Sequence, residues 1–323
     1  MIANKHSKNL TRVSFAVLFT ITLSLAFHAP LPEASAAAGD ITAVKTQSEG
    51  NNLEHDLDLG AHASLVQVDS DTYALAYTGT GTDGFISTFT ISSDGTTITE
   101  VASLEHDTDN ASHNSLVQVD SDTYALAYEG ADSDGFISTF TIDSDGNITA
   151  VKTQSEGNNL EHETDIARYN SLVQVDSDTY ALAYEGPDSD GFISTFTISS
   201  DGTTITEVAS LEHDTNIPGA NYNSLVQVDS DTIALAYTGW GADGFISTFT
   251  IDSDGTITAV KTQSEGNNLE HDTRTASYNS LVQVDSSTYA LAYEGAGGGF
   301  ISTFTIDSDG TITAVKTQSE GNN

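Results

Sequence analysis

A four-residue segment, Leu-Glu-His followed by Asp or Glu, brings together side chains that bind metals and transfer protons, and it occurs five times. We call it the LEHD segment. Imidazole and carboxylate groups form ligand sets for divalent transition metals, and histidine changes its charge near neutral pH. If the five copies lie on one face of the fold, they form a ring of binding groups. The candidate ligand-binding residues are Glu54, His55, Glu105, His106, Glu161, His162, Glu212, His213, Glu270 and His271.

Paired aspartates form a second set of short segments, in which Asp-Ser-Asp joins two apolar runs. Clustered carboxylates on adjacent turns can bind calcium, which takes about six to eight oxygen ligands. Asp and Ser also cap tight turns in which Gly adopts positive φ. The pattern therefore predicts either a site for calcium or another divalent cation, or acids that only cap turns. The candidate metal-binding residues are Asp120, Asp122, Asp143, Asp145, Asp252 and Asp254.

The single tryptophan, Trp240, lies between two glycines in a segment whose sequence varies among the repeats. Variable loops on a repeated scaffold usually carry binding specificity. An exposed tryptophan there would stack on a sugar ring. The alternative is a tryptophan that covers a local gap, and both interpretations stay open.

The elements that must position these residues repeat every 51 to 56 residues. Each repeat contains four short β-type runs, among them Ser-Leu-Val-Gln-Val, with core starts at Ser64, Ser115, Ser171, Ser224 and Ser280. Alternating apolar residues separated by turn residues indicate antiparallel hairpins. Four such strands at this period are typical of a propeller blade. We predict an all-β fold, a closed five-bladed β-propeller of four-stranded antiparallel blades. An open, solenoid-like array is the alternative, although it would leave two terminal blades with exposed faces and no polar capping repeat.

Blade topology sorts the candidate residues between two rims. The turns after the first and third strands carry the paired aspartates, while the loop after the second strand and the connection to the next blade carry Trp240 and the LEHD segments. WD-repeat propellers place a structural histidine in the corresponding connection. By this resemblance, the LEHD histidines tie a blade to its neighbour instead of binding a ligand.

The ends of the chain differ from the repeats. Residues 1–36 have a basic start, an apolar run and a small-residue cleavage site at Ala34-Ser35-Ala36, which predicts a secretory signal peptide. A retained anchor is the alternative, although the apolar run is short for a full span. The propeller is expected at 37–323, with units beginning near 53, 104, 160, 211 and 269. Residues 40–52 predict a surplus strand from a partial repeat, which would compete with residues 312–318 for the outer edge of the closing blade.

The charge is strongly acidic, with a net charge of −38 from 9 basic and 47 acidic residues. Such a surface repels nucleic acid and anionic membranes, so we expect no nucleic-acid partner and no membrane insertion after signal cleavage. The chain has no cysteine, which excludes thiol catalysis and cysteine metal sites.

An acidic turn, an apolar strand, a glycine loop and a second apolar strand make this chain resemble secreted propeller repeats. Val119 to Asp122 followed by residues 124–130 resembles the FG-GAP repeats of integrin-type propellers. The near-identical repeats resemble tachylectin-type lectins in architecture. Both resemblances cover residues 40–323 and imply a secreted binding protein, although no site residue carries over from either.

Three functions are consistent with these patterns. The first is a secreted binding module for a glycan or another cell-surface component, in which repeated blades give avidity. The second is a propeller-type lyase or hydrolase with histidines and carboxylates at the channel mouth. The third is a structural repeat protein stabilised by a divalent cation. The sequence favours the first and leaves the oligomeric state open.

Overall fold

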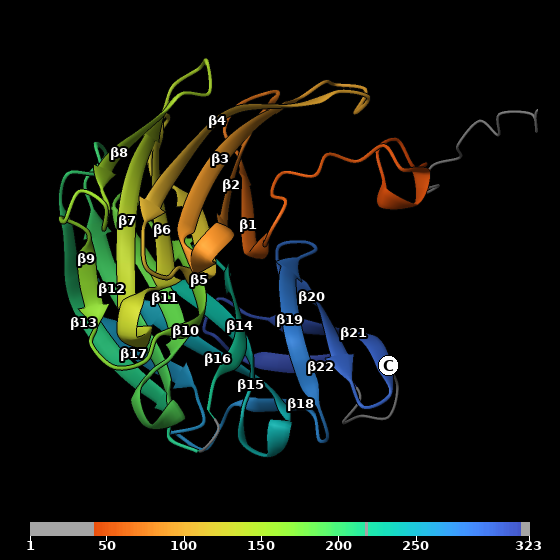
Figure 1. The fold of residues 1–323 in the computed structure, drawn as a ribbon. Helices are drawn as coiled ribbons and strands as arrows, with labels where there is room; N and C mark the ends of the chain where they lie inside the picture. The colour runs from red at the N-terminus through yellow and green to blue at the C-terminus, as the bar shows by residue number, and fades with distance from the viewer. Residues whose placement is uncertain (1–41, 217–218, 318–323) are drawn as a thin grey trace, which may run out of the picture. The chain divides into compact units, whose positions relative to one another are not determined.

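The computed structural model describes residues 42–216 and 219–317. The chain divides into two units, residues 1–43 and 44–323, and all the strands described below lie in the second. The predicted signal peptide lies outside the described residues. Within the second unit the chain forms five antiparallel sheets that follow one another in sequence order (Figure 1). This confirms the predicted all-β, five-bladed propeller.

The first three blades contain thirteen strands. Blade 1 is β1 (Ala61–Gln67), β2 (Thr72–Thr78), β3 (Gly84–Ile91) and β4 (Ile98–Asp107). Blade 2 is β5 (Ser112–Gln118), β6 (Thr123–Glu129), β7 (Gly135–Ile142), β8 (Ile148–Lys152) and β9 (Leu160–Glu163). Blade 3 is β10 (Arg168–Gln174), β11 (Thr179–Glu185), β12 (Gly191–Ile198) and β13 (Ile205–Asp214).

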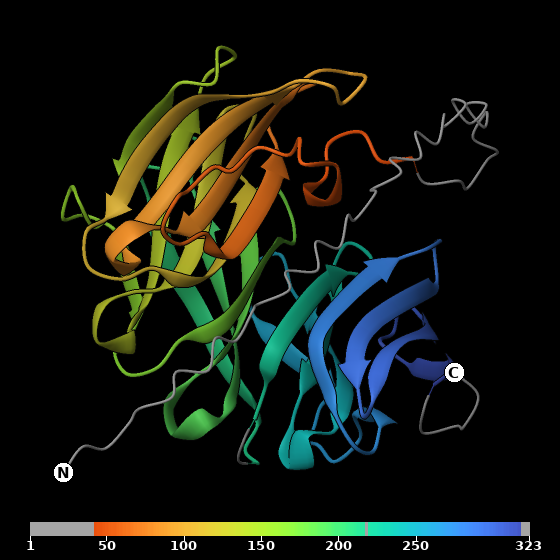
Figure 2. The same cartoon turned by 45° about the vertical axis from the view of Figure 1, so that its right-hand side comes forward.

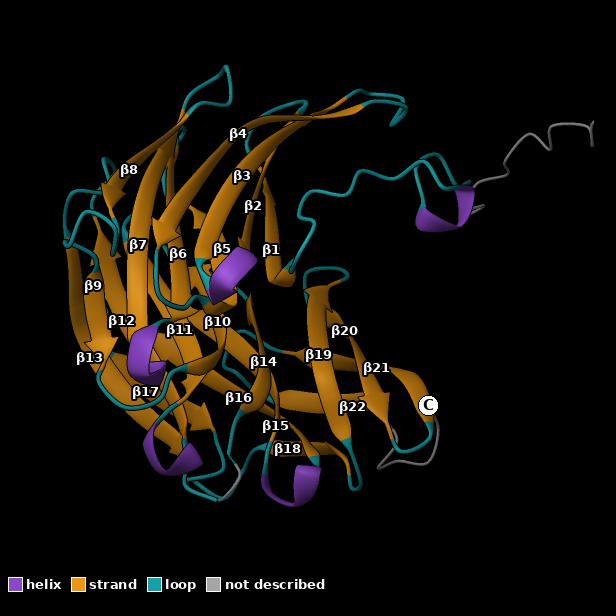
Figure 3. Cartoon of the chain, viewed as in Figure 1, coloured by secondary structure: helices purple, strands orange, loops and turns teal. Residues whose placement is uncertain are grey.

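The last two blades contain nine strands. Blade 4 is β14 (Asn221–Gln227), β15 (Thr232–Thr238), β16 (Gly244–Ile251), β17 (Ile257–Lys261) and β18 (Leu269–Asp272). Blade 5 is β19 (Ala276–Gln283), β20 (Thr288–Gly295), β21 (Gly298–Ile306) and β22 (Ile312–Lys316). Short 3-10 turns η2 (Thr80–Thr82), η3 (Ala131–Ser133), η4 (Pro187–Ser189) and η5 (Trp240–Ala242) follow the second strands of blades 1 to 4 (Figure 3). No helix among the described residues is long and apolar enough to cross a membrane.

The fourth strand takes two forms because the sequence between the repeats alternates. The short form gives one continuous strand, as in β4 and β13. The long form inserts Gln-Ser-Glu-Gly-Asn-Asn and divides the strand, so that β8 and β9 pair with β7 in succession. In that inserted turn the Asn158 side chain accepts the Thr153 N–H at 2.8 Å and so replaces a ladder hydrogen bond.

Consecutive blades pack through two unlike faces. Each blade turns a face of large side chains, the large face, toward the blade before it, and a face of small side chains, the small face, toward the blade after it. Between blades 2 and 3 the small face consists of Val119, Ala125, Ala127 and Ile137. The facing large face consists of Leu172, Tyr180, Leu182, Tyr184, Phe196 and Ile198. The same pairing recurs at the other three interfaces between blades, because the Tyr-Ala-Leu-Ala-Tyr strand alternates large and small residues across the sheet.

Two hydrogen bonds, which we call clamps, join the blades at each interface. At the first strands, Ser64 Oγ accepts the Leu116 N–H at 3.0 Å, with equivalents at the next three interfaces. At the third strands, Thr88 Oγ1 donates to Gly146 O at 2.6 Å, again with three equivalents. One clamp joins the first strands and the other lies at the third strand, so each interface is held at two separate places.

The predicted surplus strand at 40–52 is not found in residues 42–52, which instead contain a bend and the short turn η1 (Gln47–Glu49). The Asn51 side chain accepts the Thr46 N–H at 2.8 Å and donates to Val44 O at 3.0 Å. This is the same asparagine turn that follows β8. No strand precedes the turn here because the segment has no third strand of its own blade to pair with.

Candidate functional site

The strand register places the candidate residues on two rims. Ala61 pairs with Thr78 and Gly84 pairs with Asp107, so the start of β1, the end of β2, the start of β3 and the end of β4 share one edge of blade 1. We call this edge, with its equivalents in the other blades, the loop rim. It carries the η turns and the LEHD segments. The paired aspartates lie on the opposite edge, which we call the acidic rim.

Four of the five LEHD histidines lie singly, one in each interface between blades. The fifth, His55, packs against Tyr77 and Phe89 of blade 1. The His106 ring packs edge-on against Tyr128 and Phe140 of the next blade, with ring centroids 5.0 and 5.6 Å away. Burial lowers the pKa of His106, His162, His213 and His271 to about 3. Neither nitrogen of these four rings has a hydrogen-bond partner among the described residues. The four rings therefore pack between blades as neutral groups, an arrangement that favours the structural alternative.

The close fit of the histidine explains the glycine that begins each third strand. A Cβ on Gly84 would lie 2.6 Å from the Ala111 Cβ and 2.6 Å from the His106 ring. Gly135, Gly191 and Gly244 face the equivalent alanine and histidine. The histidine thus fills a space that only glycine leaves open, and a ligand could reach its ring only if two blades separated.

The LEHD glutamates instead lie near the surface of the loop rim. Glu105, Glu161, Glu212 and Glu270 each interact with the aspartate that precedes the glycine in the same blade. Partial burial, followed by repulsion from this aspartate, raises the pKa of Glu212 and Glu270. The structure therefore separates the two halves of each predicted His-Glu pair. Their ligand-binding role stays a prediction.

The aspartates of the acidic rim cap turns. Asp143 Oδ1 accepts the backbone N–H groups of Asp145 and Asn147 at 3.0 and 2.9 Å. Hydrogen bonds from Asn147, first from its side chain, lower the pKa of Asp143. Within the described ranges no three His, Asp or Glu side chains lie close enough to hold one metal ion.

The metal prediction for Asp120, Asp122, Asp143, Asp145, Asp252 and Asp254 remains open to test. Asp252 and Asp254 border a hollow of about 630 Å³ together with Asp176 and Asp231 of neighbouring turns. A rise in the melting temperature with calcium that a chelator reverses would support a cation there.

Trp240 begins η5 on the loop rim, and 61% of its surface is exposed. Gly241 beside it adopts a φ of 77°, a conformation that favours glycine. The side chain therefore does not fill a gap in the core, and its ring is accessible to a ligand.

The most continuous feature of the loop rim is a row of five aromatic rings at the starts of the innermost strands. Neighbouring rings have centroids 4.5 to 4.7 Å apart and are tilted by 47° to 57°. We call it the aromatic row. Its members are His62, His113, Tyr169, Tyr222 and Tyr278.

All five residues of the aromatic row have a φ of 50° to 55°, which costs a residue with a side chain some free energy. Each lies at a register shift between the first and second strands of its blade, so a bulge turns its ring out of the sheet. The asparagine that follows in the next blade holds the bulge: Asn114 Nδ2 donates to His62 O at 3.1 Å, and Asn223 and Asn279 do the same.

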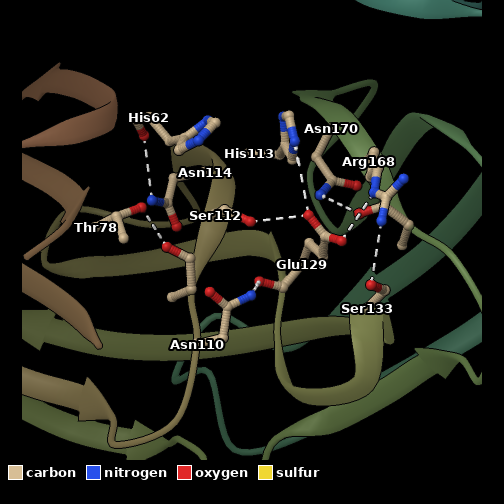
Figure 4. Close-up of polar contacts among 12 residues, drawn as sticks. His62, Thr78, Asn110, Ser112, His113, Asn114, Glu129, Ser133, Arg168 and Asn170 are labelled. Carbon is tan, nitrogen blue, oxygen red and sulfur yellow. Dashed lines mark hydrogen bonds and ion pairs between the residues drawn. The ribbon is translucent and has the colours of Figure 1, made fainter. Parts of the chain in front are cut away.

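A polar cluster interrupts the repeat symmetry beside the aromatic row (Figure 4). The buried Glu129 accepts the Arg168 Nε–H at 2.9 Å and the Ser112 hydroxyl at 2.8 Å. His113 Nε2 lies 3.6 Å from the same carboxylate, and Arg168 also donates to Ser133. Burial, followed by the nearby His62, lowers the pKa of His113 to about 4 although Glu129 opposes this shift. A carboxylate, a guanidinium and a neutral imidazole thus meet at one place.

Sequence reasoning did not single out Glu129, Arg168 or Ser112, although a signal was present. The residue paired with the end of each second strand varies along the chain: Ala61, Ser112, Arg168, Asn221 and Ser277. The end of that second strand varies too: Thr78, Glu129, Glu185, Thr238 and Glu294. The repeats are otherwise nearly identical, so positions that differ between them are candidates for a function that only some blades have.

The comparisons with known proteins agree on the fold. No protein-family model matches the sequence, and no curated protein matches it. The structure is similar to a periplasmic gluconolactonase of Pseudomonas aeruginosa, with a TM-score of 0.60, 14% identity, and coverage of 79% of this chain and 71% of that one. It is also similar to a protein from Lactobacillus plantarum, with a TM-score of 0.55, 16% identity, and coverage of 80% and 70%. These likenesses support the propeller fold and not the FG-GAP or tachylectin type predicted from sequence.

Proposed function

We propose that this chain is an exported binding module whose ligand, a carbohydrate, lies along the aromatic row. The observation that carries the proposal is the continuity of five neighbouring rings, each turned out of its sheet by a strained bulge. Backbone strain kept in every blade is typical of a functional surface. Aromatic rings with a few polar groups beside them are the usual lining of small-molecule sites.

The polar cluster fits the same ligand. Arg168, Ser112 and Glu129 offer donors and acceptors beside the rings, which suits the hydroxyl groups of a sugar. The acidic surface disfavours an anionic ligand, so we expect a neutral glycan. Trp240, on the same rim, offers a second stacking surface. Export follows from the predicted signal peptide.

Binding to a panel of neutral oligosaccharides by titration calorimetry tests the proposal. Tyr169→Ala removes a central ring and is expected to weaken binding about tenfold, whereas Tyr169→Phe keeps the ring and most of the affinity. Trp240→Ala reports separately on the η5 loop. If no glycan binds, or if Tyr169→Ala binds as the wild type does, the proposal fails.

A hydrolase is the second candidate, and the polar cluster favours it. A buried carboxylate, a neutral imidazole and a guanidinium in one asymmetric site are the groups that acid–base catalysis uses. The gluconolactonase neighbour makes sugar lactones the first substrates to try. Turnover above the uncatalysed rate that Glu129→Gln abolishes would support this function, and turnover that survives the substitution would exclude Glu129 from it.

A further inference from the structure

Two buried glutamates lie at equivalent positions of neighbouring blades, but only one of them has a cation in the next blade. Glu129 ends the second strand of blade 2, Glu185 ends the second strand of blade 3, and each is 6% exposed. Glu129 accepts hydrogen bonds from the Arg168 guanidinium at 2.9 Å and from the Ser112 hydroxyl at 2.8 Å. Arg168 reaches Glu129 from blade 3 (Figure 4) and supplies the positive charge that a buried carboxylate needs.

The residue that takes the place of Arg168 in blade 4 is Asn221, which has no charge. Figure 2 shows the chain passing from the green strands of blade 3 to the teal strands of blade 4, whose interface holds Glu185. With its amide nitrogen turned toward two acceptors, Asn221 donates to Glu185 Oε2 at 2.6 Å and to Gly219 O at 2.9 Å. Ser189 also forms a hydrogen bond with Glu185. Both of these partners are neutral, whereas Glu129 is paired with a guanidinium.

One guanidinium therefore serves two buried carboxylates. Within the described ranges, Arg168 is the only lysine or arginine that interacts with Glu185, and its direct hydrogen bond is to Glu129. Burial raises the pKa of Glu185, and the nearby charge of Glu129 acts in the same direction. His113 adds no charge at neutral pH, because its pKa is about 4. The cluster thus keeps one negative charge without a cation.

The fold does not require a glutamate at this position. Thr78 and Thr238 end the second strands of blades 1 and 4 instead. Their hydroxyls donate to Ala111 O and Ala276 O of the next blade, so a threonine fills the position without burying a charge. Burying the charge of Glu185 costs free energy, and a buried carboxylate kept at such a cost is typical of a functional site.

We propose that the loop rim between blades 3 and 4 binds an organic ammonium ion, whose positive charge pairs with Glu185. The ammonium group takes the role at Glu185 that Arg168 takes at Glu129, and Asn221 leaves room for it because asparagine is shorter than arginine. The rings of Tyr169 and Tyr222 lie at the same interface with centroids 4.7 Å apart, and aromatic faces attract ammonium groups. This site goes beyond the proposed glycan surface, which does not use Glu185 or Asn221.

An ammonium ion fits these groups better than a metal ion does. Calcium takes about six to eight oxygen ligands, and no three His, Asp or Glu side chains of the described residues lie close enough to hold one metal ion. A primary ammonium has three N–H donors, which a single carboxylate and neighbouring aromatic faces can satisfy. The net charge of −38 attracts cations of both kinds, so the selectivity comes from the local groups.

Calorimetric titration of the full chain with ethylammonium chloride and with glucosamine hydrochloride, at neutral pH and constant ionic strength, tests the inference. Glucose is the neutral comparison. We expect saturable binding of both cations and none of glucose. Glu185→Gln keeps the hydrogen bonds but removes the charge, and should weaken binding at least about 30-fold. Asn221→Arg gives Glu185 a guanidinium from the chain itself, and should weaken binding as much while raising the melting temperature.

Glu294→Gln is the matched control, because it removes an exposed glutamate at the equivalent position of blade 5 and should leave the affinity unchanged. Tighter binding of glucosamine than of ethylammonium would support an amino sugar as the source of the ammonium group, and equal binding would support a simple amine. The proposal is overturned if neither cation binds saturably, whether or not a glycan binds the aromatic row. Binding that survives Asn221→Arg, or equal losses in Glu185→Gln and Glu294→Gln, would also refute it.

Discussion

The buried histidines make this propeller sensitive to acid in a way that a single substitution can measure. The pKa of His106 is about 3 in the folded chain, against an ordinary value of about 6.5 when the chain unfolds. Because the pKa is lower in the folded chain, the contribution of neutral His106 to the free energy of unfolding is complete above about pH 6.5. This contribution is lost as the pH falls toward 3.

The magnitude follows from proton linkage. Below about pH 6.5, each such histidine reduces the free energy of unfolding by about 1.4 kcal/mol per pH unit, or about 2 kcal/mol at pH 5. His162, His213 and His271 share the same environment. Together the four would cost about 8 kcal/mol at pH 5, which is comparable to the whole stability of a typical domain.

His106→Leu isolates one of these histidines, because all other titrating groups cancel in the comparison with the wild type. Leucine has a similar volume and leaves no unpartnered nitrogen in the interface. We expect the variant to gain about 2 kcal/mol relative to the wild type between neutral pH and about pH 5, measured by urea unfolding. Ile86→Val, a buried change in the same blade, should cost about 1 kcal/mol at every pH. A difference between His106→Leu and the wild type that does not change over this range would refute the reasoning.

Three further substitutions test packing and hydrogen bonding. Gly84→Ala should cost about 1–3 kcal/mol in urea unfolding because its Cβ meets the LEHD histidine, whereas Gly299→Ala, with nothing within 4 Å, should change stability by less than about 0.5 kcal/mol. Arg168→Ala leaves Glu129 buried without its cation and should reduce the free energy of unfolding by about 1–2 kcal/mol, a figure lowered because the arginine is partly exposed. If Glu129→Gln reduces stability by the same amount and the double variant loses no more, the two side chains are coupled. Ser115→Ala removes the acceptor for the Leu172 N–H of the next blade and should cost about 1–2 kcal/mol. A neutral result would show that the clamp at the first strands is dispensable.

The architecture was predictable because the repeat states the same strand pattern five times. The alternation in Tyr-Ala-Leu-Ala-Tyr and the turn residues around it predict the strands, their order and the sorting of loops between two rims. The surplus strand was wrong for a physical reason, since residues 42–46 match a fourth strand in sequence but have no third strand to pair with.

The site was harder to predict because the same residue types have different roles according to whether they are buried between blades or lie at the rim. Histidines repeated in every blade suggest a ring of ligands. The glycine that begins each third strand instead leaves space for the LEHD histidines to be buried between blades. The aromatic row forms only because a backbone bulge turns each of its rings out of the sheet. The sequence of a single repeat does not reveal that bulge. The role of Glu129 depends on Arg168, which comes from a different blade 39 residues away.

Each interface between blades joins one large face to one small face, and this uniformity has an evolutionary consequence. A whole blade can be inserted or lost by unequal recombination without a new kind of interface having to evolve, because the same pairing of large and small faces recurs at all four described interfaces. Each such event also lengthens or shortens the aromatic row by one ring. If the aromatic row binds the proposed glycan, a change in the number of repeats changes the length of glycan that the row can hold, while each blade stays the same.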